Sequence, residues 1–193
     1  AGLEAARVAA LRGYDVDLYE KEEVLGGQIN IAAVPPRKDE ILRSVAYFEC
    51  ILPALGVSIH LGTEATKESM NAADGVIVAV GAHDMALPIP GADGANVVSS
   101  WDVLAGKAEV SGHCAVIGGG LTGCEIAYDL FLQGKKPAIV EMQDDLITTP
   151  GICLANTSYL RDCFKTNNVP VHLETAVSEI TAEGVTVTHK DGT

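Results

Sequence analysis

The stretch from Cys114 to Glu141 constrains the fold of this chain more than any other. A short apolar run leads into the glycine pattern Gly118-x-Gly120-x-x-Gly123. A helix-compatible segment follows, and a second apolar run then ends in Glu141. This order of strand, glycine loop, helix, strand and acid is the order that a dinucleotide-binding βαβ unit requires.

Each residue of this pattern has an expected physical role. Gly118 is predicted to make the tight turn, Gly120 to let the backbone approach a pyrophosphate, and Gly123 to let helix and strand pack closely. The N-terminus of the helix would present free N–H groups and a positive dipole to the phosphates. Glu141 is placed to accept hydrogen bonds from an adenosine ribose. The alternative interpretation is a glycine-rich turn without a ligand, and the strand, helix and acid in this order argue against it.

The beginning of the chain contains a second copy of the pattern. Residues 1–13 are predicted to form a helix that Gly13 ends, and residues 15–20 alternate as a strand. Four positions with a structural role recur at a fixed offset of 121. They are Gly2, Glu4, Gly13 and Glu20, which become Gly123, Glu125, Gly134 and Glu141. The repeat predicts a second nucleotide-binding unit. Because Gly2 would be the third glycine of its motif, we expect the first strand and two glycines to precede residue 1.

Further segments set the predicted domain boundary. A helical period covers residues 39–55, and residues 74–81 are predicted to form a fully apolar, buried parallel strand. The segment Met85–Gly94, rich in proline and glycine, is predicted to cross between domains. The sequence therefore predicts an FAD-binding domain over residues 1–94 and an NAD(H)-binding domain over residues 95–193.

The repeat extends beyond the glycine motifs. Residues 169–175 echo residues 57–63, so a matching strand is expected in both domains. Residues 177–181 and 185–189 are predicted to pair as antiparallel strands. The turn signal in Lys190–Thr193 has no returning strand, so we expect the C-terminal return to lie beyond this sequence, which would be a fragment.

Composition excludes several classes of function. The net charge is −13 without a block of basic residues, which argues against a nucleic-acid partner. No apolar run approaches the roughly 18–20 residues that span a bilayer, and no leader pattern opens the chain. The five cysteines are scattered, without CxxC or a metal-ligand cluster. We therefore expect a soluble cytoplasmic protein with reduced thiols and no metal site of its own.

Two nucleotide sites in tandem suggest electron transfer between two dinucleotides. The chain resembles the flavoprotein reductases with two Rossmann-like dinucleotide-binding domains, an α/β fold in which the NAD(P)H domain is inserted in the FAD domain. Four segments are most similar to the NADH:flavin oxidoreductases of the 2-enoate reductase and 2,4-dienoyl-CoA reductase type, a multidomain group related to Old Yellow Enzyme. These segments are Gly2–Arg7, Leu18–Gln28, Ala32–Pro36 and Val116–Glu125.

The resemblance implies roles for the matching positions. The expected FAD-binding residues are Gly2, Glu20, Lys21, Gly27, Gln28, Ala79 and Gly81. The expected NADH-binding residues are Gly118, Gly120, Leu121, Thr122, Gly123, Glu125 and Glu141. Glu125 would approach the nicotinamide, although an acid favoured by the helix dipole is an equally good interpretation. No residue of this chain is predicted to be catalytic.

The acids at the end of the second apolar run favour NADH over NADPH. Glu141, Asp144 and Asp145 offer three acids and no base, whereas a 2′-phosphate usually meets an arginine. Disulfide reductases of the superfamily carry a redox cysteine pair, which is absent here, because Cys124 has no partner cysteine in its motif. The disulfide reductases are therefore excluded.

The resemblance also implies a function for the whole polypeptide. Hydride would pass from NADH to FAD, and electrons would then reach an activated C=C bond through a [4Fe–4S] cluster and FMN held in an upstream barrel. This chain contains no Cys-rich cluster motif, so those groups are expected in the rest of the same polypeptide. The alternatives are a stand-alone FAD-dependent NADH oxidase or ferredoxin-type reductase, and a non-catalytic module that holds ADP.

Overall fold

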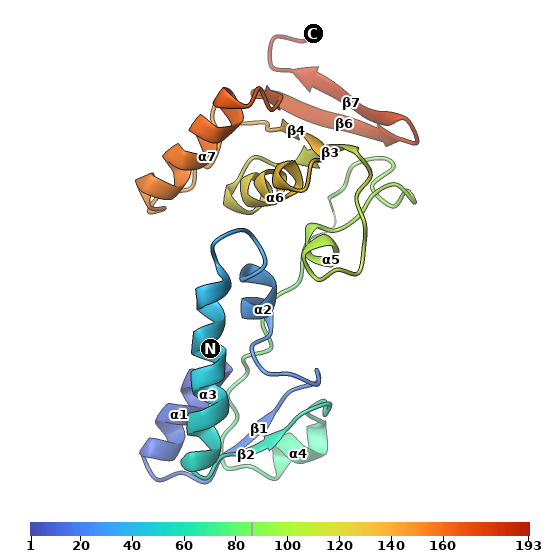
Figure 1. The fold of residues 1–193 in the computed structure, drawn as a ribbon. Helices are drawn as coiled ribbons and strands as arrows, with labels where there is room; N and C mark the ends of the chain where they lie inside the picture. The colour runs from blue at the N-terminus through green and yellow to red at the C-terminus, as the bar shows by residue number, and fades with distance from the viewer. Residues whose placement is uncertain (86) are drawn as a thin grey trace. The chain divides into compact units, whose positions relative to one another are not determined.

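The computed structural model describes residues 1–85 and 87–193; Ala86, in the predicted linker, lies outside the described residues. The chain forms two compact units, Ala1–His83 and Asp84–Thr193. Figure 1 draws the first in blue to green and the second in green to red. Both units combine helices with parallel strands, which confirms the predicted α/β class.

The first unit is built on a parallel pair of strands. Its elements are α1 Gly2–Leu11, β1 Asp17–Tyr19, α2 Gln28–Ala32, η1 Asp39–Ile41, α3 Leu42–Ala54, β2 Ser58–His60 and α4 Lys67–Asn71. Leu18 of β1 lies opposite Ile59 of β2. The buried side chains of Ala6, Leu52 and Val57 form its core, so the helices cover one face of these strands.

The second unit contains the complete strand–helix–strand pattern predicted from the sequence. Its elements are α5 Ser100–Leu104, β3 His113–Ile117, α6 Leu121–Leu132, β4 Lys136–Val140, α7 Leu154–Thr166, β5 Val171–His172, β6 Thr175–Thr181 and β7 Gly184–His189. The parallel sheet has the order β3-β4-β5, and β6 and β7 form the predicted antiparallel hairpin.

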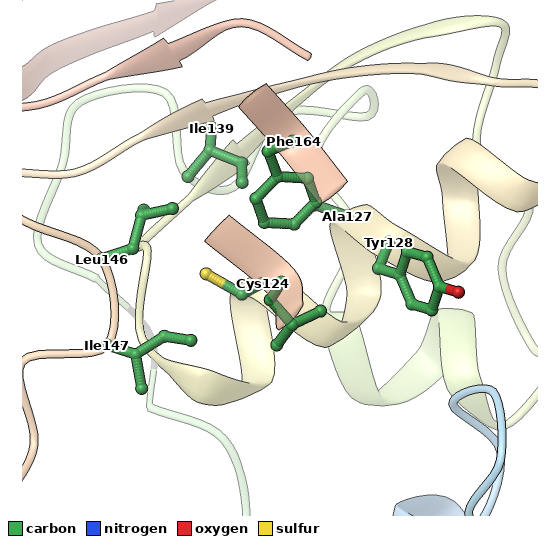
Figure 2. Close-up of a cluster of buried hydrophobic side chains, with 8 residues drawn as sticks. Cys124, Ala127, Tyr128, Ile139, Leu146, Ile147 and Phe164 are labelled. Atoms are coloured by element: carbon green, nitrogen blue, oxygen red, sulfur yellow. The ribbon is translucent and has the colours of Figure 1, made fainter. Parts of the chain in front are cut away.

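A single apolar cluster joins α6 and α7 to the parallel sheet of the second unit (Figure 2). Its buried members are Cys124, Ala127, Tyr128, Ile139, Leu146, Ile147, Leu160 and Phe164. Leu146 and Ile147 belong to the loop after β4, not to a helix or strand. The core therefore reaches up to the loop that contains the predicted nucleotide-binding acid.

The structure confirms the internal repeat and adds a second offset. Helices α3 and α7 are both 13 residues long, and adding 112 to the bounds of α3 gives those of α7. Leu52 and Phe164 correspond and are both almost completely buried. Tyr19 of β1 pairs with His60, and the corresponding residues Val140 and His172 also pair.

One predicted strand is wrong. Residues 75–81 have no regular secondary structure, and residues 74–81 belong to no sheet of the described residues. Val78 is 73% and Val80 is 90% exposed, not buried. An apolar run indicates a preference for burial, but a strand also needs a neighbour that completes its hydrogen bonds, and the β1–β2 pair does not extend to this segment.

The residues after His83 pack within the second unit. The Pro90 carbonyl accepts a hydrogen bond from the Ile180 N–H at 2.8 Å. Asn96 donates its side-chain amide to the Thr181 carbonyl at 2.8 Å. These contacts attach Pro90 and Asn96 to the C-terminal end of β6.

Candidate functional site

The glycine loop between β3 and α6 is closed on one side and open on the other. Gly118 has φ +103°, a conformation that favours glycine. A Cβ on Gly123 would lie 2.0 Å from the Gly118 carbonyl oxygen, so the first turn of α6 touches the loop backbone. A Cβ on Gly120 would meet no atom within 4 Å. The open side therefore lies at Gly120, next to the N-terminus of α6.

Glu141 ties the glycine loop to the end of β4. Its Oε2 accepts the Gly119 N–H at 2.6 Å, and its Oε1 accepts the Gln143 N–H at 2.7 Å. The residue is only 8% exposed. Because an ionised carboxylate has about four acceptor positions, two such bonds leave capacity for a further donor such as a ribose hydroxyl.

Gly119 is a site residue that the sequence analysis missed. A Cβ there would lie 2.5 Å from Leu146 Cδ2 and 3.0 Å from the Glu141 Cβ. Its carbonyl accepts the Ile147 N–H at 2.8 Å. Ile147 has φ +51°, which is unusual for a β-branched residue. Gly119 occupies a variable position of the motif, so only the fact that it is glycine could have indicated its packing role.

Arg161 of α7 is a second residue that the sequence analysis missed. Its Nε and Nη2 donate to the two carboxylate oxygens of Asp145 at 3.1 and 3.0 Å. Nη2 also donates to the Leu146 carbonyl. These hydrogen bonds lower the pKa of Asp145. Residues 141–145 themselves contain no base, but the fold brings Arg161 of α7, 16 residues away in the sequence, to Asp145.

Cys124 lies beneath the same loop and is chemically inert. It is completely buried, and this burial raises the pKa of its thiol to about 12. Its Sγ donates to the Gly119 carbonyl at 3.3 Å. All five cysteines are free. Because the thiolate is the reactive form, Cys124 is not available for thiol redox chemistry near neutral pH.

In the first unit, several predicted FAD-binding residues lie close together. The Gln28 side chain donates to the Ala82 carbonyl at 2.7 Å, and a Cβ on Gly81 would lie 3.3 Å from the Gln28 amide nitrogen. A Cβ on Gly2 would lie 3.3 Å from the Ala79 Cβ. The exposed segment 74–82 therefore runs past both the start of α1 and the start of α2.

The end of β1 repeats the geometry at the end of β4. Glu20 Oε1 accepts the Glu22 N–H at 3.0 Å, as Glu141 accepts the Gln143 N–H. The Glu20 carbonyl accepts the Thr63 N–H and the Glu141 carbonyl accepts the Thr175 N–H, both at 2.9 Å. The two acids of the repeat thus have the same local backbone partners.

The remaining predicted site residues lie around these two centres. Lys21 is exposed after β1, and Gly27, with φ +52°, precedes α2. Leu121 and Thr122 begin α6, and Glu125 is half-buried one turn further along the helix. Within residues 1–85 and 87–193, no group of three or more His, Cys, Asp or Glu could hold a metal ion. No helix in the same residues is long and apolar enough to cross a membrane.

Comparisons with known proteins agree with this geometry. The family model of the pyridine nucleotide-disulphide oxidoreductases matches residues 1–193. Cinnamate reductase of Clostridium sporogenes is 44% identical over 187 residues, which are 95% of this chain and 28% of the relative. NADH oxidase of Thermoanaerobacter brockii is 43% identical over 152 residues, 76% of this chain and 23% of the relative.

A solved structure of a 2-naphthoyl-CoA reductase complex has a similar fold over almost the whole chain. The TM-score is 0.90 at 26% identity, covering 99% of this chain and 29% of that chain. The chain thus spans less than a third of the length of these proteins. Together with the two repeated units, the match over all residues shows that the chain belongs to the pyridine nucleotide-disulphide oxidoreductase family.

Proposed function

We propose that this chain is the FAD- and NADH-binding part of a longer flavoprotein oxidoreductase. The first unit would bind FAD and the second NADH. The observation that carries the proposal is the repeated geometry at the ends of β1 and β4. There Glu20 and Glu141 share two equivalent backbone partners, and each follows the strand that a dinucleotide-binding unit uses for its ribose.

The glycine loop of the second unit fits a pyrophosphate. Space is open around Gly120, and α6 is long enough, at 12 residues, to present its N-terminal N–H groups and dipole to phosphates. Glu141 would accept the ribose hydroxyls with its remaining acceptor capacity. Glu125, one turn along α6, would face the nicotinamide end.

We infer a preference for NADH over NADPH. Glu141 is buried beside the loop, and a 2′-phosphate there would face a second anion. Asp145 engages Arg161 on both carboxylate oxygens, so the nearby cation is already neutralised. Replacing Glu141 with arginine is expected to shift the preference toward NADPH, and an unmoved preference would show that the acid does not face the ribose.

When bound, NADH supplies a hydride and FAD accepts it. The longer polypeptide would use the electrons to reduce an activated C=C bond of the enoate or dienoyl-CoA type. The names of the cinnamate and naphthoyl-CoA reductases support this choice of substrate class. FMN and a [4Fe–4S] cluster would be held by residues outside this sequence.

The test uses Gly120→Val in the full-length protein. A Cβ at this open position would meet no atom within 4 Å, so we expect the fold to remain while a valine side chain blocks the pyrophosphate. Gly112→Val is the matched control, because Gly112 precedes β3 and also has no neighbours within 4 Å of a Cβ. We expect NADH binding to be lost in the first variant only, with bound flavin unchanged. Unchanged NADH affinity in Gly120→Val would reject the assignment.

A second candidate is an NADH oxidase that transfers electrons without the barrel. The Thermoanaerobacter relative supports NADH oxidation as such, but this chain covers only 23% of that protein, so the relative does not support the absence of a barrel. A count of FAD, FMN and iron in the full-length protein separates the two. One FAD, one FMN and about four irons support the relay to a C=C bond. FAD alone supports the oxidase, and a protein with nucleotide but no flavin is a non-catalytic module.

A further inference from the structure

The two units stabilise the loop after their acidic residue in different ways. In the second unit, the Leu146 carbonyl accepts a hydrogen bond from Arg161 Nη2, and the same guanidinium binds both carboxylate oxygens of Asp145. In the first unit, the equivalent Leu25 carbonyl accepts from Asn30 Nδ2 at 2.9 Å. Both leucines are about 5% exposed.

The arginine contact has no counterpart in the first unit. The repeat offsets place Glu49 at the position of Arg161 and Val24 at the position of Asp145. Neither residue could form the same ion pair. The cation on α7 is therefore a feature of the proposed NADH-binding unit alone.

A short chain of contacts connects Arg161 to the glycine loop. Arg161 holds the Leu146 carbonyl, and the Leu146 side chain lies directly against Gly119. The next residue, Ile147, donates its N–H to the Gly119 carbonyl at 2.8 Å. Glu141 accepts the Gly119 N–H on the other side. The N–H and the carbonyl of Gly119 are thus both hydrogen-bonded to residues of the loop that Arg161 contacts.

We propose that Arg161 is a positioning residue that holds the loop Glu141–Ile147 against the glycine loop and thereby sets the affinity for NADH. This inference rests on the proposed function of the second unit. Arg161 acts through Leu146 and Ile147, not by contact with the nucleotide. Arg161 would raise the affinity for NADH by ordering the loop beforehand, because a loop that is already ordered loses less conformational freedom when the nucleotide binds.

The ion pair itself contributes little. The Arg161 side chain is 30% and that of Asp145 55% exposed, and ion pairs at such positions are largely screened. The hydrogen bond to the Leu146 carbonyl is the important contact, because it comes from a charged donor to a buried residue. A planar guanidinium can bind a carboxylate and a carbonyl together, which a lysine ammonium does less well.

The experiment compares four variants of the full-length protein. Arg161→Met removes the guanidinium and keeps an unbranched apolar stem, and Arg161→Lys is the conservative replacement. Asp145→Asn removes the charge of the ion pair and one of its two acceptor oxygens, while the remaining oxygen can still accept the Leu146 N–H and Arg161 Nε. Lys165→Met is the matched control, because it removes an exposed cation one turn along α7 that, in the part of the chain the structure describes, makes no side-chain hydrogen bond to the loop. The measurements are the Kd and KM for NADH, kcat at saturating NADH, and amide hydrogen exchange.

We expect Arg161→Met to raise the Kd and KM for NADH about tenfold, the effect of losing one hydrogen bond to a charged group. The kcat at saturating NADH should change less than about twofold, since the residue does not touch the reacting atoms. Arg161→Lys should be intermediate, and Asp145→Asn and Lys165→Met should stay within about threefold. Peptides that contain Gly119 and Ile147 should exchange faster in Arg161→Met, while those from the middle of α6 should not.

Different outcomes reject different parts of the inference. An equal effect of Arg161→Met and Lys165→Met would reject positioning in favour of general electrostatic attraction. Unchanged exchange at Gly119 and Ile147 would also reject it, whatever the affinity. If the native protein does not bind NADH, the proposed function fails. Should Arg161→Met not fold, Arg161→Lys gives the decision, because positioning predicts a higher KM for NADH with unchanged kcat.

Discussion

The two units share a backbone plan, but the third glycine of the motif meets different neighbours in each. Gly2 and Gly123 occupy equivalent positions at the start of α1 and α6. A Cβ on Gly123 would lie 2.0 Å from a backbone oxygen, whereas on Gly2 it would lie 3.3 Å from a methyl carbon of Ala79. At the offset of 121, Gly118 has no counterpart within residues 1–193, so the two values report different neighbours: a loop carbonyl at Gly123 and the Ala79 side chain at Gly2.

The largest expected effect is that of alanine at these two positions. Gly123→Ala forces α6 away from the loop backbone and should lower the free energy of unfolding of the second unit by at least about 3 kcal/mol. Within residues 1–193, Gly2→Ala displaces only the Ala79 methyl group, by a few tenths of an ångström, and should cost this chain less than about 1 kcal/mol. Urea unfolding of the two variants measures both values. Equal losses would show that the two glycines have the same packing role.

A smaller effect is expected from Glu141→Gln compared with Glu20→Gln. Glu141 is buried and accepts two backbone N–H groups, and a glutamine can accept only one of them without turning its NH2 toward a donor. The loss should be about 2 kcal/mol of stability in the second unit. Glu20 is half-buried, with one N–H bond from Glu22, and should lose about 1 kcal/mol or less. Thermal unfolding distinguishes them, and a larger loss at Glu20 would contradict this comparison.

The smallest structural effect is expected at the cysteines. Cys124 has a thiol pKa of about 12 and is completely buried, so it stays protonated from pH 7 to pH 9 and should not react with an alkylating reagent. Cys50 and Cys153 are exposed and should react within the same time. Mass spectrometry of the alkylated protein reads this directly. Cys124→Ala should leave the rate of flavin reduction by NADH unchanged. A large decrease in that rate would show that the Cys124 thiol takes part in the reaction.

The parts that the sequence predicted are those with a local pattern. The order of strand, glycine loop, helix and acid around Gly118 and Glu141 is contained in consecutive residues, and the repeat doubles the signal. Arg161 could not be predicted, because its role depends on how α7 folds back onto the loop after β4. The prediction of a strand at residues 74–81 failed for the same reason, since an apolar run does not specify which strand will pair with it. Contacts between distant segments are what the pattern does not contain.

The change of offset within the repeat bears on how the two units diverged. The offset is 121 up to Leu25 and 112 from α3 onward, so the first unit has nine more residues in between. That interval contains α2, which supplies both Gln28 and Asn30. A gene duplication followed by one gain or loss of nine residues would produce both offsets. The loop after the acid is therefore supported from inside this interval in the first unit, by an amide of α2, and from beyond it in the second unit, by a guanidinium of α7.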